Sequence, residues 1–428
     1  MPSQKYNLNG GLHALRKFIT QLSKKSQLLQ PPVLSMMMTE EQAAAIASDH
    51  DELDRVLSML SPDEGQPRAM SRATVNTLVS EAIEASLKEN NSVSVDERIG
   101  ASIALLETKL KAQPSDWEVW RTVDRLKVPA EGFTLGKVFF CSAEHEAAKK
   151  TRERMVTWLE SKFNPLLPQT VLHFWPERYS AQTLCRIATK AVDATAAREL
   201  ADGELQTTMA VLNFFASLVF DTSFLPVVCI PGNVSTYTIS ELATPKEPEP
   251  AFFSAHSAHR YTAPFDLSTL NSDPRVGAAF AKAGSLLRDE GQRDFRDRLL
   301  TAIKWAGKGA ASQTEEDAYL FYAIALESLL IGGKKHDQIA YKLRLRAAHL
   351  IGINPKGRAS VRDHVKDLYD LRSAMVHSGK TRIPKTDLVL LRFLTQSCII
   401  HILGTDRFEK ITTDEAIEQW FEDLLMAD

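Results

Sequence analysis

From about residue 275 to its end, the sequence repeats one pattern: an amphipathic segment of helical length, then a short joint that contains glycine or proline. Short connections between long amphipathic helices favour antiparallel packing. Residues 271–428 are therefore predicted to form an up-and-down helical bundle. The predicted helices span 291–308, 315–332, 337–352, 359–378, 385–404 and 413–426.

The chain before this bundle mixes helices with short strands. Residues 1–125 are predicted to be helical, with helices at 11–30, from Thr39 onward, at 71–87 and at 94–110. Residues 126–270 are predicted to form an α+β domain that ends in a proline-rich linker at 244–250. Its expected strands are 132–140, 171–175, 227–230 and 234–239, and its expected helices are 181–200 and 204–220. The predicted fold class is mainly α, with an α+β N-terminal region that carries a small sheet before the C-terminal bundle.

Composition and motif content argue against several classes of protein. Apolar content of 44% and charged content of 25% are typical of globular domains. The four cysteines form no CxxC pair, so neither a zinc site nor a disulfide framework is expected. No glycine-rich phosphate loop follows a strand, and no apolar leader or membrane-length run is found. We expect a cytoplasmic protein with no cofactor, no metal site and no membrane partner.

The predicted helix at 359–378 carries an arginine on its apolar side. On a helical wheel, Arg372 lies near the middle of a stripe that includes Val365, Leu368 and Tyr369. A charge in this position is costly unless it is paired or lines a site. It either forms a structural ion pair with a carboxylate such as Glu327 or belongs to a functional site.

His377 lies about 120° from this stripe on an ideal wheel. It shares its flank with Asp370 and Ser373, and Ser373 is close enough to bond to the imidazole. The alternative is an exposed histidine that interacts with the helix dipole. Because Arg372 and His377 point different ways, we expect them to meet at a frayed helix end or across an interface between two copies.

Four helical motifs follow one another in the C-terminal half: RLLTAIKW at 298–305, AYLFYAIALESLL at 318–330, KLRLRAAHLIG at 342–352 and LYDLRSAMVH at 368–377. In this order they resemble the Apea-like HEPN family. The second is similar to that family's ALESLL helix, and the fourth resembles its LYDLRSxxVHG helix. The resemblance covers residues 290–405, about a quarter of the chain.

The resemblance implies a dimeric bundle of four or five helices with a catalytic Arg-His pair at Arg372 and His377. Other pairs of similar spacing, Arg344 with His349 and Arg358 with His364, then have no catalytic role. The sequence departs from the family where Ser373 follows the arginine and where Ser378 separates the histidine from glycine. The supporting residues are expected to be Ser373, Asp370, Glu327 and Tyr369.

Positive charge is concentrated around this pair. Residues 334–392 contain 14 Lys and Arg residues and five Asp, an excess of nine positive charges in a chain whose net charge is -3. Such a surface suits phosphate binding, although a solvated helix face is the alternative. The expected RNA-binding residues are Lys342, Arg346, Lys380 and Arg382.

These features lead to one preferred function and two alternatives. The preferred function is a metal-independent endoribonuclease in which His377 moves a proton and Arg372 binds the phosphate, leaving a 2′,3′-cyclic phosphate. The resemblance implies a homodimer with a toxin or anti-phage defence role, regulated by a partner or trigger that residues 1–250 recognise. The alternatives are a non-catalytic HEPN-like regulator that binds nucleic acid or nucleotide, and a purely structural dimerisation bundle.

Overall fold

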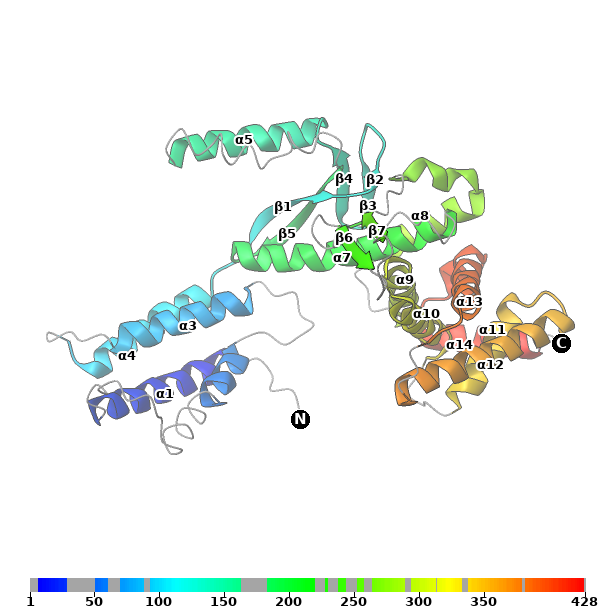
Figure 1. Cartoon of the computed structure of the whole chain (residues 1–428). Helices are drawn as coiled ribbons and strands as arrows, with labels where there is room; N and C mark the ends of the chain where they lie inside the picture. Colours follow the sequence, from blue (N-terminus) through cyan, green and yellow to red (C-terminus); the bar gives the residue numbers. More distant parts are fainter. Residues whose placement is uncertain are drawn as a thin grey trace. The chain divides into compact units, whose positions relative to one another are not determined.

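The computed structural model is mainly helical, with a small antiparallel sheet in the N-terminal half and a helical C-terminal region, as the sequence predicts (Figure 1). It describes residues 7–28, 51–60, 70–87, 93–162, 183–219, 228–229, 238–243, 252–257, 264–288, 294–312, 314–332, 338–378 and 382–426. The chain divides into two compact units, Met1–Val119 with Ala188–Gly203, and Trp120–Ile187 with Glu204–Asp428. The predicted domain borders at 125 and 270 both fall inside the second unit.

The first unit contains α1 (Leu8–Leu28), α3 (Arg72–Leu87), α4 (Val95–Leu110) and a helical segment at 51–60. Their apolar faces form one core, which includes Leu15, Ile19, Val56, Val75 and Ile99. The start of α4 has the local chemistry that the sequence indicates. The Ser94 side chain accepts from the Glu97 backbone N–H, and the Glu97 side chain accepts from the Ser94 backbone N–H.

A four-stranded sheet follows, in the strand order β1-β5-β4-β3. Its strands are β1 (Ser115–Val123), β3 (Phe133–Leu135), β4 (Val138–Ser142) and β5 (Thr183–Ala191). The single strand predicted at 132–140 is instead a hairpin, because Gly136 has φ +62 between two strands that pair antiparallel. A side chain at Gly136 would also meet Leu287.

The prediction of two helices at 181–200 and 204–220 is wrong, because the structure has one strand and one long helix there. Residues 183–191 form β5, and α7 (Ala194–Val219) is one continuous helix that passes through Gly203. Five residues of β5 pair with β4, and this long-range pairing outweighs the local helical tendency. Gly203 does not end the helix, since helix interiors tolerate one glycine at a cost of only about 1 kcal/mol.

Two smaller pairings complete the strands. β2 (Leu126–Lys127) pairs in parallel with β8 (Phe265–Asp266), and β6 (Thr238–Ala243) pairs antiparallel with β7 (Phe252–Ser257). The proline-rich segment at 244–250 lies outside the described residues, but the strands on either side of it belong to one hairpin. The strand predicted at 171–175 and the start of the helix predicted from Thr39 also lie outside the described residues, and at 227–230 only Val228 and Cys229 are described.

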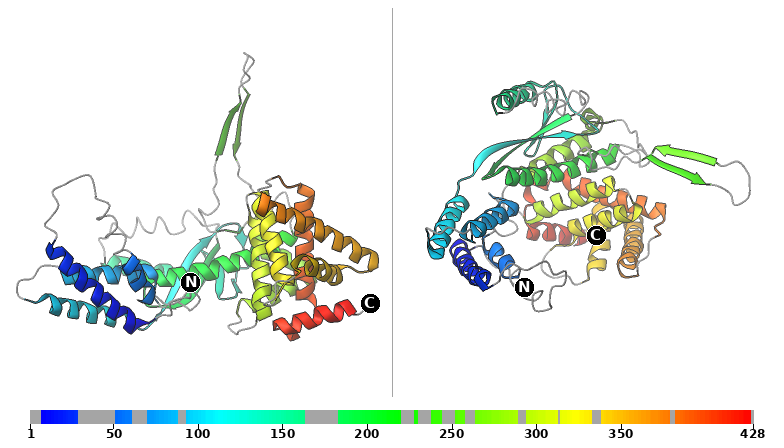
Figure 2. Two further views of the ribbon diagram at one scale, coloured as in Figure 1. Left: turned by 90° about the horizontal axis from the view of Figure 1, so that it is seen from below. Right: turned by 60° about the vertical axis from the view of Figure 1, so that its left-hand side comes forward.

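The rest of the second unit is a group of helices, drawn from green to red in Figure 1 and seen from two further sides in Figure 2. The helices are α8 (Pro274–Leu286), α9 (Asp294–Ala311), α10 (Glu315–Leu330), α11 (Ile339–Ile351), α12 (Pro355–Ser378), α13 (Lys385–Gly404) and α14 (Asp414–Met426). The ends of α9 to α14 agree with the predicted helix ends to within a few residues. An additional helix, α8, precedes those predicted.

Helix α13 lies inside this group and contacts α8, α9, α10, α11 and α12. Among the described residues it is the helix that is long and apolar enough to cross a membrane. Much of it is covered by protein, and its buried Arg392 donates to the Ser217 carbonyl of α7. A buried arginine bonded to a neighbouring helix is typical of a core helix.

Candidate functional site

Helix α12 is held against α10 by buried apolar side chains and by one buried hydrogen bond. Val365, Leu368 and Leu371 are buried on its inner face. The Tyr319 hydroxyl of α10 donates to the Leu368 carbonyl of α12 over 2.7 Å. This contact places Tyr369 and Arg372, the next residues on that side of α12, beside α10.

Arg372 forms an ion pair with Glu327 of α10. Arg372 Nε lies 3.1 Å from Glu327 Oε1, and Arg372 Nη2 donates to Glu327 Oε2 over 3.5 Å. The Arg372 guanidinium also lies 5.9 Å from the centre of the Tyr369 ring. The two charged side chains are 24% and 23% exposed, so the pair is neither fully buried nor free in solvent. Of the expected supporting residues, Glu327 and Tyr369 are thus next to Arg372.

Burial changes the proton affinity of both neighbours of Arg372. It raises the pKa of the Glu327 carboxyl, and Arg372 opposes this rise. It also raises the pKa of the Tyr369 hydroxyl, with a further rise from Glu327. A carboxyl with a raised pKa beside a cation is one arrangement found at active sites, and it is also found in structural ion pairs.

Replacing Glu327 with glutamine is expected to change how stability depends on pH. Because the folded-state pKa of Glu327 is raised above its ordinary 4.5, the wild type loses stability as the pH rises through that folded-state value. Glutamine does not titrate, so the variant should gain stability relative to the wild type from about pH 4.5 toward neutrality. Urea unfolding midpoints across this range measure the difference. A stability difference that is independent of pH would contradict a raised pKa of the Glu327 carboxyl.

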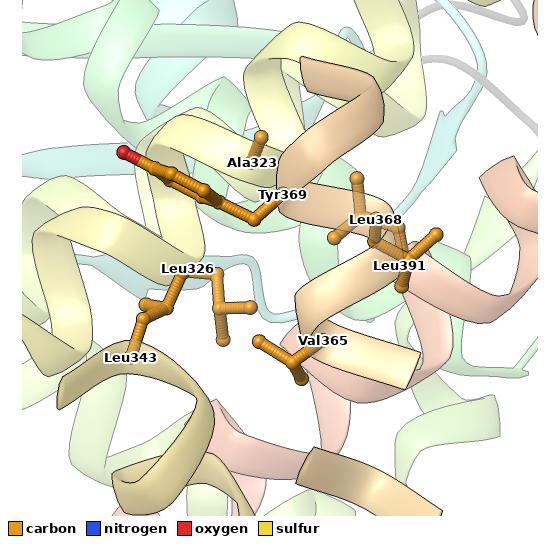
Figure 3. Close-up of a pocket in the computed structure, with 7 residues that line it drawn as sticks. All are labelled: Ala323, Leu326, Leu343, Val365, Leu368, Tyr369 and Leu391. Atoms are coloured by element: carbon orange, nitrogen blue, oxygen red, sulfur yellow. The ribbon is translucent and has the colours of Figure 1, made fainter. Parts of the chain in front are cut away.

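A small apolar pocket lies between Tyr369, the neighbour of Arg372, and residues of α10 (Figure 3). In Figure 3 the Tyr369 ring extends from α12 past Ala323 of α10. The pocket has room for about one water molecule, too little for a nucleobase. The pocket therefore does not hold a base, and any nucleic acid at Arg372 would contact the exposed part of the ion pair. The pocket is lined by Ala323, Leu326, Leu343, Val365, Leu368, Tyr369 and Leu391.

His377 is exposed in the last turn of α12. In the described part of the chain, no hydrogen bond or ion pair joins it to Ser373, Asp370 or Arg372. Asp370 instead lies 3.6 Å from Lys366 in an exposed pair. Ser373 is partly exposed one residue after the arginine. The expected support of His377 by Asp370 and Ser373 is therefore not seen within one chain.

The helix remains regular through His377, because α12 ends at Ser378. The expected meeting of Arg372 and His377 at a frayed helix end is thus not found. Two residues five positions apart on a regular helix point about 140° apart. Within one chain, Arg372 is directed toward α10, whereas His377 is accessible to solvent.

Arg346 does not lie on an exposed basic surface, which corrects the prediction made from the sequence. It is 8% exposed, and its guanidinium donates to the Leu330 carbonyl and to both carboxylate oxygens of Glu418. It also lies 4.8 Å from the ring centre of Phe421. Glu418 of α14, a helix distant in sequence, neutralises this arginine, so Arg346 has a structural role.

A second arginine completes this arrangement at the end of α10. Arg298 of α9 donates to the Ser328 and Leu329 carbonyls and pairs with Asp414 of α14 over 2.6 Å. Arg298 and Arg346 thereby bind the last carbonyls of α10, which have no partner within that helix. They also fasten α14 to the bundle.

The other predicted RNA-binding residues are less constrained. Lys342 is partly exposed on α11, and Arg382 is exposed just before α13. Lys380 lies outside the described residues. The predicted basic surface is thus reduced to Lys342 and Arg382 in the part of the chain that can be described. No group of three or more His, Cys, Asp or Glu side chains among the described residues is arranged to hold a metal ion.

Comparison with known proteins adds no relative: no protein-family model, no curated protein and no solved structure matches this chain.

Proposed function

We propose that this chain is a metal-independent endoribonuclease of the HEPN type. The observation that carries the proposal is the arrangement of α12. Its Arg372 lies beside Glu327 and Tyr369, and its exposed His377 follows five residues later within the HEPN-like run LYDLRSAMVH. RNA cleavage by its own 2′-hydroxyl needs a group that moves a proton and a group that stabilises charge on the phosphate, and an accessible histidine and an arginine can supply these two functions.

In the proposed reaction, the 2′-oxygen of RNA attacks the adjacent phosphorus while the bond from phosphorus to the 5′-oxygen breaks. His377 accepts the proton of the 2′-hydroxyl while water protonates the leaving 5′-oxygen, or His377 protonates that oxygen while water accepts the first proton. Arg372 binds the non-bridging oxygens and stabilises the charge that develops on them. The products are a 2′,3′-cyclic phosphate and a 5′-hydroxyl, and no metal ion takes part.

We further propose that two copies form the active dimer. Within one chain, Arg372 and His377 face different directions, so a second copy is needed to bring an arginine and a histidine to the same phosphate. Apolar side chains near this end of α12 and on the first half of α13 are accessible for such a contact. Val376 is 53% exposed, Val389 50% and Phe393 62%. Isolated exposed apolar residues are common, so the test is the oligomeric state in solution.

The cellular role we propose is that of a regulated toxin or anti-phage effector in the cytoplasm. An RNase that acts on cellular RNA has to be silent until it is needed, and residues 1–250 are the part of the chain that would recognise a trigger or regulatory partner. Four buried cysteines without a disulfide, Cys141, Cys185, Cys229 and Cys398, suit a reducing compartment.

A non-catalytic regulator that binds nucleic acid or nucleotide is the second candidate. The ion pair with Glu327 favours it, because Glu327 competes with a phosphate for the Arg372 guanidinium. Cleavage of labelled RNA in the presence of a chelator, with identification of the product ends, separates the two candidates. Cyclic-phosphate ends support the nuclease. RNA binding without cleavage by the dimer supports the regulator.

Replacing Arg372 with alanine is expected to reduce cleavage by at least about 100-fold, the usual effect of removing a group that stabilises transition-state charge. Because the pair with Glu327 is partly exposed, the melting temperature should fall by only a few degrees. Cleavage rate and thermal unfolding, measured on the same preparation, check both parts. A large loss of stability with unchanged activity per folded molecule would instead show that Arg372 is a structural residue.

A further inference from the structure

The four-stranded sheet of residues 115–191 has one covered face and one partly open face. On the covered face, Phe133 of β3 stacks on Phe280 of α8 with ring centres 5.7 Å apart. Phe280 in turn contacts Phe215 of α7. Side chains alternate between the two faces along a strand, so neighbours of these residues in sequence point to the opposite side.

On that opposite side, three strands place an arginine between two aromatic rings. Phe139 of β4 and Arg186 of β5 are paired in register, so their side chains lie next to each other on one face. The Arg186 guanidinium lies 5.2 Å from the centre of the Phe139 ring and 6.0 Å from that of the Trp120 ring. The three residues form a row, Trp120–Arg186–Phe139, that runs across β1, β5 and β4.

Each member of this row is partly exposed. The indole nitrogen of Trp120 is buried, so any part of the indole that is exposed is carbon surface. The row continues on β3 with Thr134, which is paired with Phe139 and is exposed. The sheet thus presents flat apolar rings and a positive charge at its surface.

The loop that contains Gly132 packs closely against the Phe139 ring. Gly132 has φ +82, and a side chain there would come within 2.6 Å of the Phe139 ring. The His145 ring meets the same phenylalanine edge-on, with centres 5.3 Å apart. Helix α5 (Glu146–Lys162) begins immediately afterwards, and its buried Ala148 packs with Cys141 and Leu184 of the same sheet face.

The first turns of α5 add basic residues next to this face. Residues 144–154 contain Lys149, Lys150, Arg152 and Arg154 against Glu144, Glu146 and Glu153, and Lys149 pairs with Glu144 over 2.9 Å. The start of α5 therefore adds an excess of one positive charge close to Ala148, which packs on this face, and Arg186 lies on the face itself. Aromatic rings that stack on bases, together with cations that attract phosphates, are the two elements of a surface that binds single-stranded nucleic acid.

We propose that this face of the sheet binds single-stranded RNA. Unpaired bases stack on Trp120 and Phe139, and Arg186 attracts the phosphates between them. A duplex does not fit this chemistry, because its base faces are already stacked within the helix. The inference goes beyond the proposed cleavage site, and it does not depend on the chain being a nuclease.

The test measures binding in the absence of cleavage. A fluorescent single-stranded oligonucleotide of 2′-O-methyl RNA lacks the nucleophile, so the full-length wild-type protein binds it without cutting it. Replacing Trp120 or Phe139 with alanine is expected to weaken binding at least about tenfold, as measured by fluorescence anisotropy. The same oligonucleotide as a duplex should bind more weakly than the single strand.

If an alanine variant of Trp120 or Phe139 does not fold, substitutions of Thr134 provide a second test of RNA binding. Thr134 is exposed, so Thr134→Glu and Thr134→Lys remove no packing. The glutamate should weaken binding, whereas the lysine should strengthen it and increase the salt dependence by about one phosphate contact. Thr77→Glu, on an exposed position of α3 in the other unit, is the matched control and should have no effect.

Equal affinities of the Thr134 variants, or folded alanine variants that bind as tightly as the wild type, would overturn the proposal. So would absence of binding, or a preference for the duplex. The outcome is separable from that of the nuclease proposal. If the sheet variants weaken RNA binding but the wild type cleaves no RNA, only the nuclease proposal is contradicted. RNA cleavage by a protein whose RNA affinity is unchanged by the sheet variants would contradict only this inference.

Discussion

Replacing His377 with alanine is expected to abolish cleavage of a labelled RNA pool in the presence of a chelator. A histidine that moves a proton in the transition state contributes about 100- to 10,000-fold to the rate, so the variant should retain about 1% of the activity or less. His377 is exposed in the last turn of α12, so the melting temperature should hardly change. The wild type should leave 2′,3′-cyclic phosphate ends with or without chelator.

His364 offers a matched control for this experiment. It is an exposed histidine on the same helix, and the spacing of Arg358 and His364 is only one residue wider than that of the proposed pair. His364→Ala should cleave RNA like the wild type. Equal loss of activity in both variants would point to a general effect of the helix surface. Cleavage that requires a divalent ion would contradict the proposed mechanism directly.

Replacing Arg346 with alanine is expected to lower the free energy of unfolding more than any other substitution proposed for this chain. The change removes the bonds to Glu418 and to the Leu330 carbonyl, and it leaves both acceptors partly buried without a donor. Breaking such a charge-assisted pair costs about 2–4 kcal/mol, a little below the fully buried case because Glu418 is partly exposed. The unfolding transition of the bundle should shift down by roughly 5–10 °C.

Arg362→Ala is the control for the Arg346 variant. Arg362 pairs with Asp363 over 2.9 Å on the surface of α12, with side chains 46% and 63% exposed. Removing it should change stability by less than about 1 kcal/mol. Thermal unfolding followed by circular dichroism compares the two variants. A fully stable Arg346→Ala protein with weakened RNA binding would restore the surface role that the sequence suggested.

Much of the C-terminal half could be predicted because its signals are local. Helical periodicity and glycine or proline joints place α9 to α14 within a few residues of their observed ends. A helix satisfies its own backbone, so its position depends on residues within a few turns. The same is true of the start of α4, where Ser94 and Glu97 bond to each other's backbone.

The sheet was harder to predict, because a strand depends on partners far along the chain. Residues 183–191 pair with a strand more than 40 positions earlier, and residues 115–123, which were not expected to form a strand, join the same sheet. The row of Trp120, Arg186 and Phe139 therefore could not be read from the sequence. Its three members become neighbours only when β1, β5 and β4 lie side by side.

Arg372 and Arg346 show most clearly which features depend on local sequence and which depend on tertiary packing. The sequence alone determined that Arg372 lies on the apolar stripe of its helix, and it named Glu327 as one partner to consider. Only the tertiary structure decided that this pair forms, that His377 faces solvent, and that Arg346 binds Glu418 rather than a surface ligand. Helix periodicity determines which way a side chain points, whereas the packing of distant helices determines which charge it meets.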